Sequence, residues 1–146
     1  MATTAYLAYG SLLYWSTDTG NTYNELADIK EMGSPGDPDS PEVDITPLAN
    51  GLSVREFKAG LATMGTFQFK QFWTKTRLAA LLTQYRVGVL WKVIFPDNAT
   101  PSSASNFVFA GYLKKCTTEG GDNPDSPLLI SCEVKLTGTR VFTAGS

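Results

Sequence analysis

The sequence contains no histidine, and it is poor in charged side chains. Histidine is the most frequent general base, metal ligand and triad partner, so its absence removes the commonest routes to hydrolytic and metal-dependent catalysis. Charged residues form 18% of the 146 residues, whereas globular proteins usually carry about 25%. The net charge is −2 and the longest basic run is Lys114 with Lys115, which gives no stripe for binding phosphates. We therefore expect neither an enzyme nor a conventional nucleic-acid binder.

The sequence also lacks the short motifs that mark nucleotide sites, nucleophile sites and membrane segments. No G-x-S-x-G elbow, G-x-x-x-x-G-K-[ST] loop or G-x-G-x-x-G turn occurs, so we expect no cofactor. No run of eighteen apolar residues could span a bilayer. The first fifteen residues lack the cationic start and unbroken apolar stretch of a signal peptide. These features predict synthesis in the cytosol and no membrane association.

Cysteine is scarce, with only Cys116 and Cys132 present. Two thiols do not form a disulfide framework, and no metal-ligand partners lie at a useful spacing. We interpret them as reduced and partly buried. If the flanking strands form a hairpin about the turn at residues 120–127, an even pairing register places the two cysteines opposite each other. The hydrophobic pattern does not fix that register.

Most of the sequence consists of segments that predict β-strands, separated by turns. Apolar or alternating segments at residues 5–16, 66–73, 87–95, 106–119 and 128–142 predict strands, and residues 22–32 favour a strand over a short helix. Phe67 and Phe69 are expected on one buried face. The final strand is expected to bury alternate residues, namely Leu128, Ile130, Cys132, Val134 and Leu136.

One helix is predicted at residues 74–86, with Thr74 or Thr76 as its N-cap. The spacing i, i+3, i+4, i+7 predicts a shared face packed on the core, formed by Leu78, Leu81, Leu82 and Tyr85. The fold class is therefore mainly β, a two-sheet β-sandwich or barrel with one flanking α-helix, in a single domain of residues 1–146.

A long irregular loop is predicted at residues 33–50, where GSPGDPDSP holds three prolines and two glycines. Within it Val43 and Ile45 are expected to face one way. Four carboxylates in this loop suggest a calcium site, but they lack the glycine and terminal glutamate of the calcium-loop pattern, so a solvated acidic loop is the favoured interpretation. These carboxylates are Asp37, Asp39, Glu42 and Asp44.

Three tryptophans, Trp15, Trp73 and Trp91, raise the alternative of a carbohydrate-binding platform. All three lie in apolar runs, where core or interface packing is the more frequent role of a large aromatic side chain. A soluble β-sandwich binding module therefore stays as an alternative function, and packing is the favoured interpretation.

The order of features over residues 29–73 resembles the major tail tube protein of long-tailed (siphovirus-type) bacteriophages. Residues 29–33 (IKEMG) precede a Pro/Gly/Asp loop, and residues 41–48 (PEVDITPL) resemble the family segment P-E-x-I-D-V-T-x-L. An R/K-x-F-x-x-G-like stretch at residues 55–60 and the strand at residues 65–70 (GTFQFK) follow. The predicted helix at residues 78–85 comes where that family has one.

This resemblance implies the phage tail-tube fold and a structural role in the virion. Six subunits would form a ring, and stacked rings would form a β-lined tube through which DNA is ejected. The partners would be other copies of the chain, with tape-measure, tail terminator and baseplate proteins, and DNA would be only a non-specific cargo in the lumen. Assembly would take place in the host cytoplasm. A secretion-system tube protein of the same fold is the related alternative.

The resemblance also implies which segments contact neighbouring subunits or rings. The predicted inter-subunit loop consists of Gly33, Ser34, Pro35, Gly36, Asp37, Pro38, Asp39, Ser40, Pro41, Glu42, Val43, Asp44, Ile45, Thr46, Pro47 and Leu48. The second candidate contact consists of Gly120, Gly121, Asp122, Asn123, Pro124 and Asp125.

Overall fold

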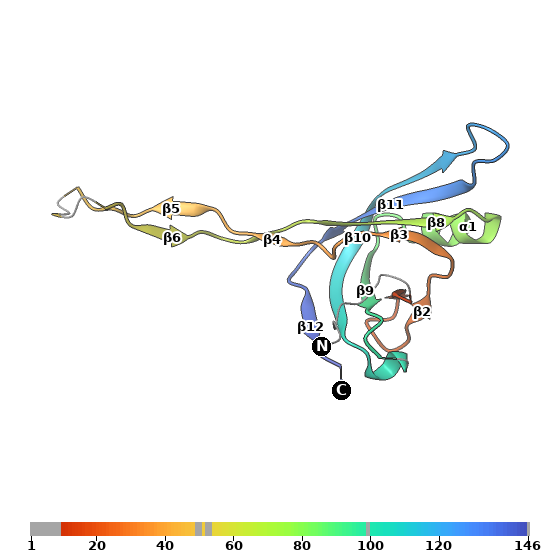
Figure 1. Cartoon of the computed structure of the whole chain (residues 1–146), viewed down its shortest axis with the longest axis horizontal. Coiled ribbons are helices and arrows are strands. Elements are labelled where there is room, and N and C mark those ends of the chain that lie inside the picture. Colours follow the sequence, from red (N-terminus) through yellow and green to blue (C-terminus); the bar gives the residue numbers. More distant parts are fainter. Residues whose placement is uncertain (1–9, 49–50, 52–53, 99, 146) are drawn as a thin grey trace, which may run out of the picture.

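The computed structural model describes residues 10–48, 51, 54–98 and 100–145. Within these residues the chain forms twelve β-strands, one α-helix and one 3-10 turn (Figure 1). The first five residues of the strand predicted at 5–16 lie outside the described part. In chain order the elements are β1 (Leu12–Ser16), β2 (Asn24–Glu25), β3 (Ile29–Met32), β4 (Pro38–Asp39), β5 (Glu42–Asp44), β6 (Phe57–Ala59), β7 (Thr63–Met64), β8 (Thr66–Phe72), α1 (Lys75–Thr83), β9 (Gly88–Ile94), η1 (Pro101–Ser103), β10 (Asn106–Gly120), β11 (Leu128–Leu136) and β12 (Val141–Thr143).

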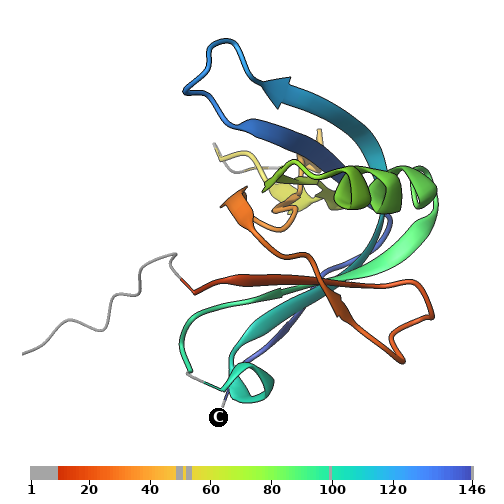
Figure 2. The ribbon, with the colours of Figure 1, turned by 90° about the vertical axis from the view of Figure 1, so that its right-hand side faces the viewer.

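The body of the molecule is one antiparallel sheet that folds back on itself. Its strand order is β2-β1-β9-β10-β11-β8-β3, with β12 paired to β10 off this path. The long strand β10 belongs to both halves, because its first part pairs with β9 and its second part with β11. Figure 2 shows β10 running from one layer into the other. The mainly β fold is confirmed. The sequence predicted two sheets, whereas the body has one continuous sheet with two halves.

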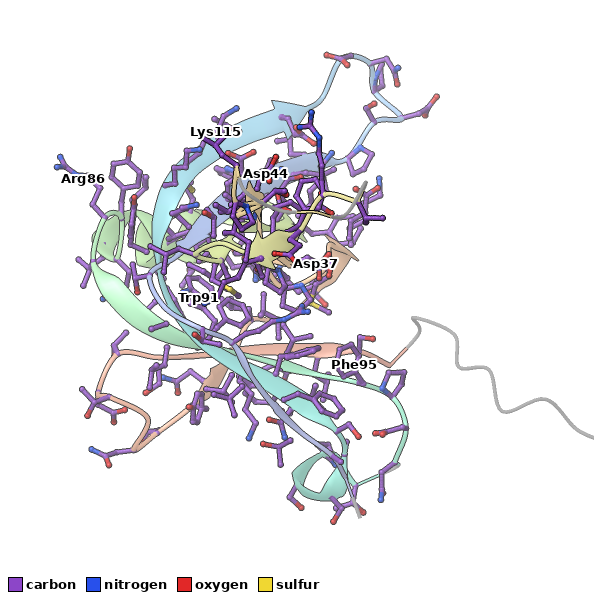
Figure 3. The ribbon with its side chains drawn as sticks, turned by 90° about the vertical axis from the view of Figure 1, so that its left-hand side faces the viewer. Asp37, Asp44, Arg86, Trp91, Phe95 and Lys115 are labelled. Atoms are coloured by element: carbon purple, nitrogen blue, oxygen red, sulfur yellow. The ribbon has the colours of Figure 1, made fainter. Side chains whose placement is uncertain are left out.

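Aromatic side chains fill the space between the two layers. Trp91 of β9 is fully buried and lies 5.8 Å, between ring centroids, from Phe69 of β8. Phe67 contacts Phe109 of β10 edge to face at 5.4 Å, and Trp15 lies 5.6 Å from Trp91. Such offset and edge-on ring pairs add to the free energy gained from burial. The inward faces of β8 and β9 thus form the centre of the core, with Trp91 at its middle (Figure 3).

The strand alternation read from the sequence is confirmed in the sheet. Phe67 and Phe69 are buried on β8, and Ile130, Cys132, Val134 and Leu136 are buried on β11. Leu128 is exposed instead, because it is the first residue of β11 and lies beside the exposed hairpin tip. Residues 22–32 contain β2 and β3, so the strand interpretation of this segment is also confirmed.

The helix begins where the sequence predicts but is shorter. Thr74 is the N-cap, and its hydroxyl accepts a hydrogen bond of 3.2 Å from the Arg77 backbone N–H. The helix ends at Thr83, after nine residues, and the chain then turns at Arg86 with φ 67°. Among the described residues no helix is long and apolar enough to cross a membrane.

The predicted core face of the helix is only half correct. Leu81 is buried and Leu78 is partly buried, but Leu82 is 52% exposed and Tyr85 is 43% exposed. Tyr85 lies beyond the helix end, so the seven-residue spacing no longer puts it on the helix face. Leu82 lies one position after the buried Leu81, about 100° around the helix, and faces outward. The helix therefore covers the core with a narrow stripe.

Candidate assembly surfaces

The described residues between 33 and 65 form a long two-stranded ribbon that projects from the body and is called the arm here (Figure 1). It continues the pairing of β3 with β8, since Met32 pairs with Phe69, Pro38 with Met64 and Glu42 with Ala59. The Gly33 N–H donates to the Gln68 carbonyl at 2.8 Å, and the Gly60 N–H donates to the Pro41 carbonyl at 2.7 Å. The arm is thus the outer part of one hairpin whose inner part lies in the body sheet.

This finding corrects the prediction of an irregular loop at residues 33–50. The three prolines predict that no strand forms here, yet Pro38 begins β4 and the Pro41 carbonyl accepts a ribbon hydrogen bond. In a two-stranded ribbon one side of each strand has no partner, so a proline on that side removes no ladder hydrogen bond. The described part of the predicted loop is therefore one strand of the arm.

The arm exposes apolar side chains on both of its faces. Val43 and Ile45 lie on one face and are 46% and 49% exposed, while Phe57 pairs opposite Asp44 on the other face and is 55% exposed. A two-stranded hairpin alone in water is only marginally stable. Its apolar residues stabilise the arm only when another surface covers them and removes them from water.

Local polar contacts hold the described outer part of the arm together. The Glu56 N–H donates to the Thr46 hydroxyl at 2.6 Å, and the Asp44 carboxylate accepts from the Thr46 N–H at 2.9 Å and from Arg55 at 3.3 Å. The Thr46 N–H lowers the pKa of Asp44, with a smaller contribution from Arg55. These contacts fix the backbone of the arm but leave Val43, Ile45 and Phe57 uncovered.

Arg140 fastens the base of the arm to the body. One of its guanidinium nitrogens donates to the Pro35 carbonyl and to the Asp37 carboxylate, each at 3.0 Å. The guanidinium also lies over the Phe107 ring at 4.4 Å from the centroid, a favourable cation–π position. Ser34 donates to the same Asp37 carboxylate at 2.7 Å. The direction in which the arm leaves the body is therefore set by a side chain close to the C-terminal end of the chain.

Two further contacts complete this base. Gly36 has φ 53°, and a Cβ there would lie 2.6 Å from Leu136, so the position accepts only glycine without a shift. The Lys135 ammonium donates to the Met64 carbonyl at 2.9 Å. The roles of Arg140 and Lys135 could not be predicted from the sequence, because their contacts join segments far apart in the chain.

The four carboxylates of the arm are spread along it rather than gathered. Asp37 forms an ion pair with Arg140 at the base of the arm, and Asp44 forms one with Arg55 farther out. Both aspartates are labelled in Figure 3. Asp39 and Glu42 lie between them and are exposed. This arrangement is that of separate surface charges.

The second predicted contact, at residues 120–125, forms the tip of the β10–β11 hairpin. Gly120 and Gly121 have φ of 88° and 73°, values that favour glycine. Asn123 accepts a hydrogen bond of 3.0 Å from the Asp125 N–H through its side chain. Below the tip, Glu119 forms an ion pair with Lys70 of β8 at 2.8 Å, which raises the pKa of Lys70. The tip is exposed and stands away from the arm (Figure 1).

Exposed apolar residues also gather around the helix. Phe72 and Trp73 lead into α1, and the Trp73 N–H donates to the Leu128 carbonyl at 3.0 Å. Trp15 and Trp91 are buried while Trp73 is 36% exposed, so the three tryptophans do not share one exposed face. The set of exposed large apolar residues in this region is Phe72, Trp73, Leu82, Tyr85, Val87 and Leu128.

The two layers of the body diverge at one side, and an open groove of about 1150 Å³ lies between them there. Phe95 and Phe107 pack edge to face in it at 5.6 Å, and Phe142 lies 5.1 Å from Phe107. Met32 and Pro35, at the base of the arm, also line the groove. Sequence reasoning missed this groove, because the aromatic residues that line it come from segments far apart in the chain: β8, the residue after β9, β10 and β12.

Comparison with known proteins gives matches in structure but not in sequence. No family model and no curated protein matches the chain. A chain of the PVC sheath/tube terminator, from an extracellular contractile injection system in its extended state, has a TM-score of 0.72 at 10% identity, covering 99% of this chain and 100% of that one. A chain from the tail of an empty GTA particle with C6 symmetry has a TM-score of 0.68 at 13% identity, covering 96% and 100%.

A chain of the SPP1 tail tube is also similar, with a TM-score of 0.58 at 11% identity, covering 93% of this chain and 76% of that one. The fold is therefore the one found in tail and tube proteins of phages, of the GTA particle and of contractile injection systems. The predicted tail-tube fold is confirmed. The neighbours come from several kinds of tail, so they do not single out the long-tailed phages.

Proposed function

We propose that this chain is a structural, non-enzymatic subunit of a tail tube, and that copies of it associate through the arm. One observation carries the proposal: a body with the tail-tube fold extends a paired arm whose apolar side chains are uncovered on both faces. A hairpin with this surface is stabilised when a second subunit packs against it. The neighbour that supplies that surface is another copy of the same chain.

The free energy available to such contacts is substantial. Fully burying an exposed large apolar side chain contributes roughly 1.5–3 kcal/mol. Val43, Ile45 and Phe57 are each about half exposed, so covering the exposed part of each contributes about half of that amount. Because these three side chains lie on both faces of the arm, either one or two neighbouring subunits can cover them. The exposed residues around α1 and the tip at residues 120–125 are further candidate contacts within the assembly.

The proposal extends to a finer arrangement. Six copies form a ring, the ring places sheet edges of neighbouring copies side by side, and rings stack into the tube. Edge strands such as β3 and β12 carry unpaired backbone groups that a neighbouring copy can use. The net charge of −2 suits a conduit through which DNA is ejected without adhering. The tube belongs to a virion-like particle assembled in the host cytoplasm, with tape-measure, terminator and baseplate proteins as partners.

The test removes the outer arm without disturbing its base. Residues 42–59 are replaced by Asn-Gly, a pair that favours a two-residue hairpin turn, between Pro41 and Gly60, which already share a ribbon hydrogen bond. The full chain is expected to form rings or tubes in negative-stain micrographs at high concentration. The shortened chain is expected to keep the circular dichroism and cooperative unfolding of the body and to form no tubes.

Two results would contradict the proposal at different levels. Tubes of normal length from the shortened chain would show that the arm is not the joint. A full chain that stays strictly monomeric at high concentration and is retained by a carbohydrate column would instead indicate a soluble binding module.

A further inference from the structure

We infer that Cys116 and Cys132 form a disulfide-forming site that links the two strands of the β10–β11 hairpin. The two residues are direct partners in the antiparallel pairing, and their sulfur atoms lie 3.7 Å apart as free thiols. Residues directly opposite each other in such a pair have Cα and Cβ separations within the range that a disulfide spans. The inference stands independently of the proposed function.

A β-bulge creates this juxtaposition. Leu113 pairs with Val134, but the register shifts before Lys115, which pairs with Glu133. If the register at Leu113 continued unbroken, Cys132 would face Lys115, and Cys116 would face Ser131. The extra residue at Lys114 therefore brings the two sulfur atoms to the same rung and the same face.

The segment after the helix holds the bulge in place. The Arg86 N–H donates to the Leu113 carbonyl at 3.3 Å, and the Tyr85 hydroxyl donates to the Lys114 carbonyl at 3.5 Å. A bulge leaves carbonyls without ladder partners, and here these two groups are satisfied from outside the hairpin. Figure 3 shows Arg86 and Lys115 at the outer surface of this region. The bulge is thus fixed by the fold, and with it the cysteine pairing.

The two thiols differ in access and in acidity. Cys116 is partly buried and Cys132 is buried. The Cys132 thiol donates to the Cys116 sulfur, which lowers the pKa of Cys116. The same hydrogen bond, together with burial, raises the pKa of Cys132. Cys116 is therefore the thiol that meets an oxidant first, as a thiolate.

The oxidant class that fits is a low-molecular-weight disulfide, RSSR. The Cys116 thiolate attacks one sulfur of RSSR, which forms a Cys116–SR mixed disulfide and releases one RS⁻. Cys132 then loses its proton to solvent, and its sulfur attacks Cys116 and displaces the second RS⁻. Both leaving groups take up the released protons, so two protein thiols and RSSR give one protein disulfide and two RSH. The protein is oxidised by two electrons and RSSR is reduced.

The test uses the full chain, purified reduced and then incubated with oxidised glutathione. After denaturation and alkylation, mass spectrometry is expected to show no free thiol, a mass lower by two hydrogens, and a linked pair of peptides containing Cys116 and Cys132. Dithiothreitol should reverse the change. The link closes a loop between residues 16 positions apart, so the oxidised chain should unfold at a temperature higher by roughly 5–10 °C.

Three variants give matched controls. Cys132→Ser should stop at a glutathione adduct on Cys116, because no second thiol lies within reach. Cys116→Ser should react slowly or not at all, because Cys132 is buried. The double variant Lys115→Cys, Cys116→Ser moves the thiol by one position to the outer face and should form no internal disulfide. Circular dichroism checks that each variant is folded.

Three outcomes would overturn the inference. In the first, both thiols of the folded chain stay free under conditions that fully oxidise the same chain in denaturant. In the second, the wild type accumulates a stable glutathione adduct or a disulfide between two chains. In the third, the Lys115→Cys, Cys116→Ser variant forms the internal bond as readily as the wild type.

Discussion

The body and the arm are made of the same kind of strand but differ in what covers their apolar side chains. In the body, Trp91 and Phe67 are fully buried between two layers that the chain itself supplies. In the arm, Val43 and Phe57 lie on a ribbon with one layer only, and both stay about half exposed. Burial stabilises the body within one chain, whereas the arm needs a second surface. The difference separates the part of the molecule whose apolar side chains are covered within one chain from the part whose apolar side chains stay uncovered.

The largest expected effect comes from a matched pair of truncations, one in each region. Trp91→Ala should lower the free energy of unfolding by about 3–5 kcal/mol, because the side chain contacts Trp15 and Phe69 in the core. Val43→Ala should change it by less than about 0.5 kcal/mol, because the side chain is exposed in the single chain. Urea unfolding of the monomer measures both. Equal losses would contradict the separation between the two regions.

An intermediate effect is expected at the joint between the regions. Arg140→Ala removes the hydrogen bonds to Pro35 and Asp37 and the contact with Phe107, and should cost about 1–3 kcal/mol. Amide hydrogen exchange should rise at the base of the arm and stay unchanged around Trp91. Arg140→Lys serves as the control. It keeps the positive charge but lacks the planar guanidinium group that donates to two acceptors, so an intermediate exchange rate is expected. If the Ala variant shows no faster exchange at Asp37, Arg140 does not fasten the arm.

The smallest expected effect concerns acid stability, and it compares one carboxylate in each region. Hydrogen bonds from the Ser105 side chain and backbone lower the pKa of Asp97 in the body, and the Thr46 N–H lowers the pKa of Asp44 in the arm. A lowered pKa in the folded state stabilises the fold above the ordinary pKa, and this contribution is lost as pH falls through the folded value, below about pH 4.

Asp97→Asn should therefore make the unfolding of the body less dependent on pH in that acid range. Asp44→Asn should leave the unfolding of the body unchanged, because its partners Thr46 and Arg55 lie within the arm. Acid titration followed by tryptophan fluorescence measures both variants. A shift of the body transition in the Asp44 variant would mean that the arm contributes to the stability of the body.

Most of the body could be predicted from the sequence, because its signals are local. Alternation on β8 and β11 identified Phe67, Phe69, Ile130 and Val134 as inward residues, and a threonine N-cap located the start of the helix. The predicted end of the helix was wrong, because the Arg86 N–H donates to the carbonyl of Leu113 in a distant strand and this hydrogen bond stabilises a turn at Arg86. Local spacing carries no information about such a contact.

The arm and the cysteine pair show the same limit in two other forms. Proline is a reliable sign against an interior strand, but Pro38 lies in a ribbon with a free side, which only the pairing partner at Met64 reveals. The cysteine register depends on one extra residue at Lys114, and a shift of one residue cannot be read from apolar alternation. Arg140 was missed as a joint residue because Asp37 lies 103 positions away.

Because the arm continues the β3–β8 hairpin, its length depends directly on the number of residues in its two strands. Each added pair of residues lengthens an antiparallel ribbon by about 3.4 Å, and two added residues on each strand restore the original faces. Equal insertions beyond Pro41 and before Gly60, whose hydrogen bond marks the inner boundary, would extend the reach by about 7 Å without moving a residue of the core. If subunits join through the arm as proposed, the spacing between them is set by the number of residues in this one segment, while the rest of the molecule stays constant.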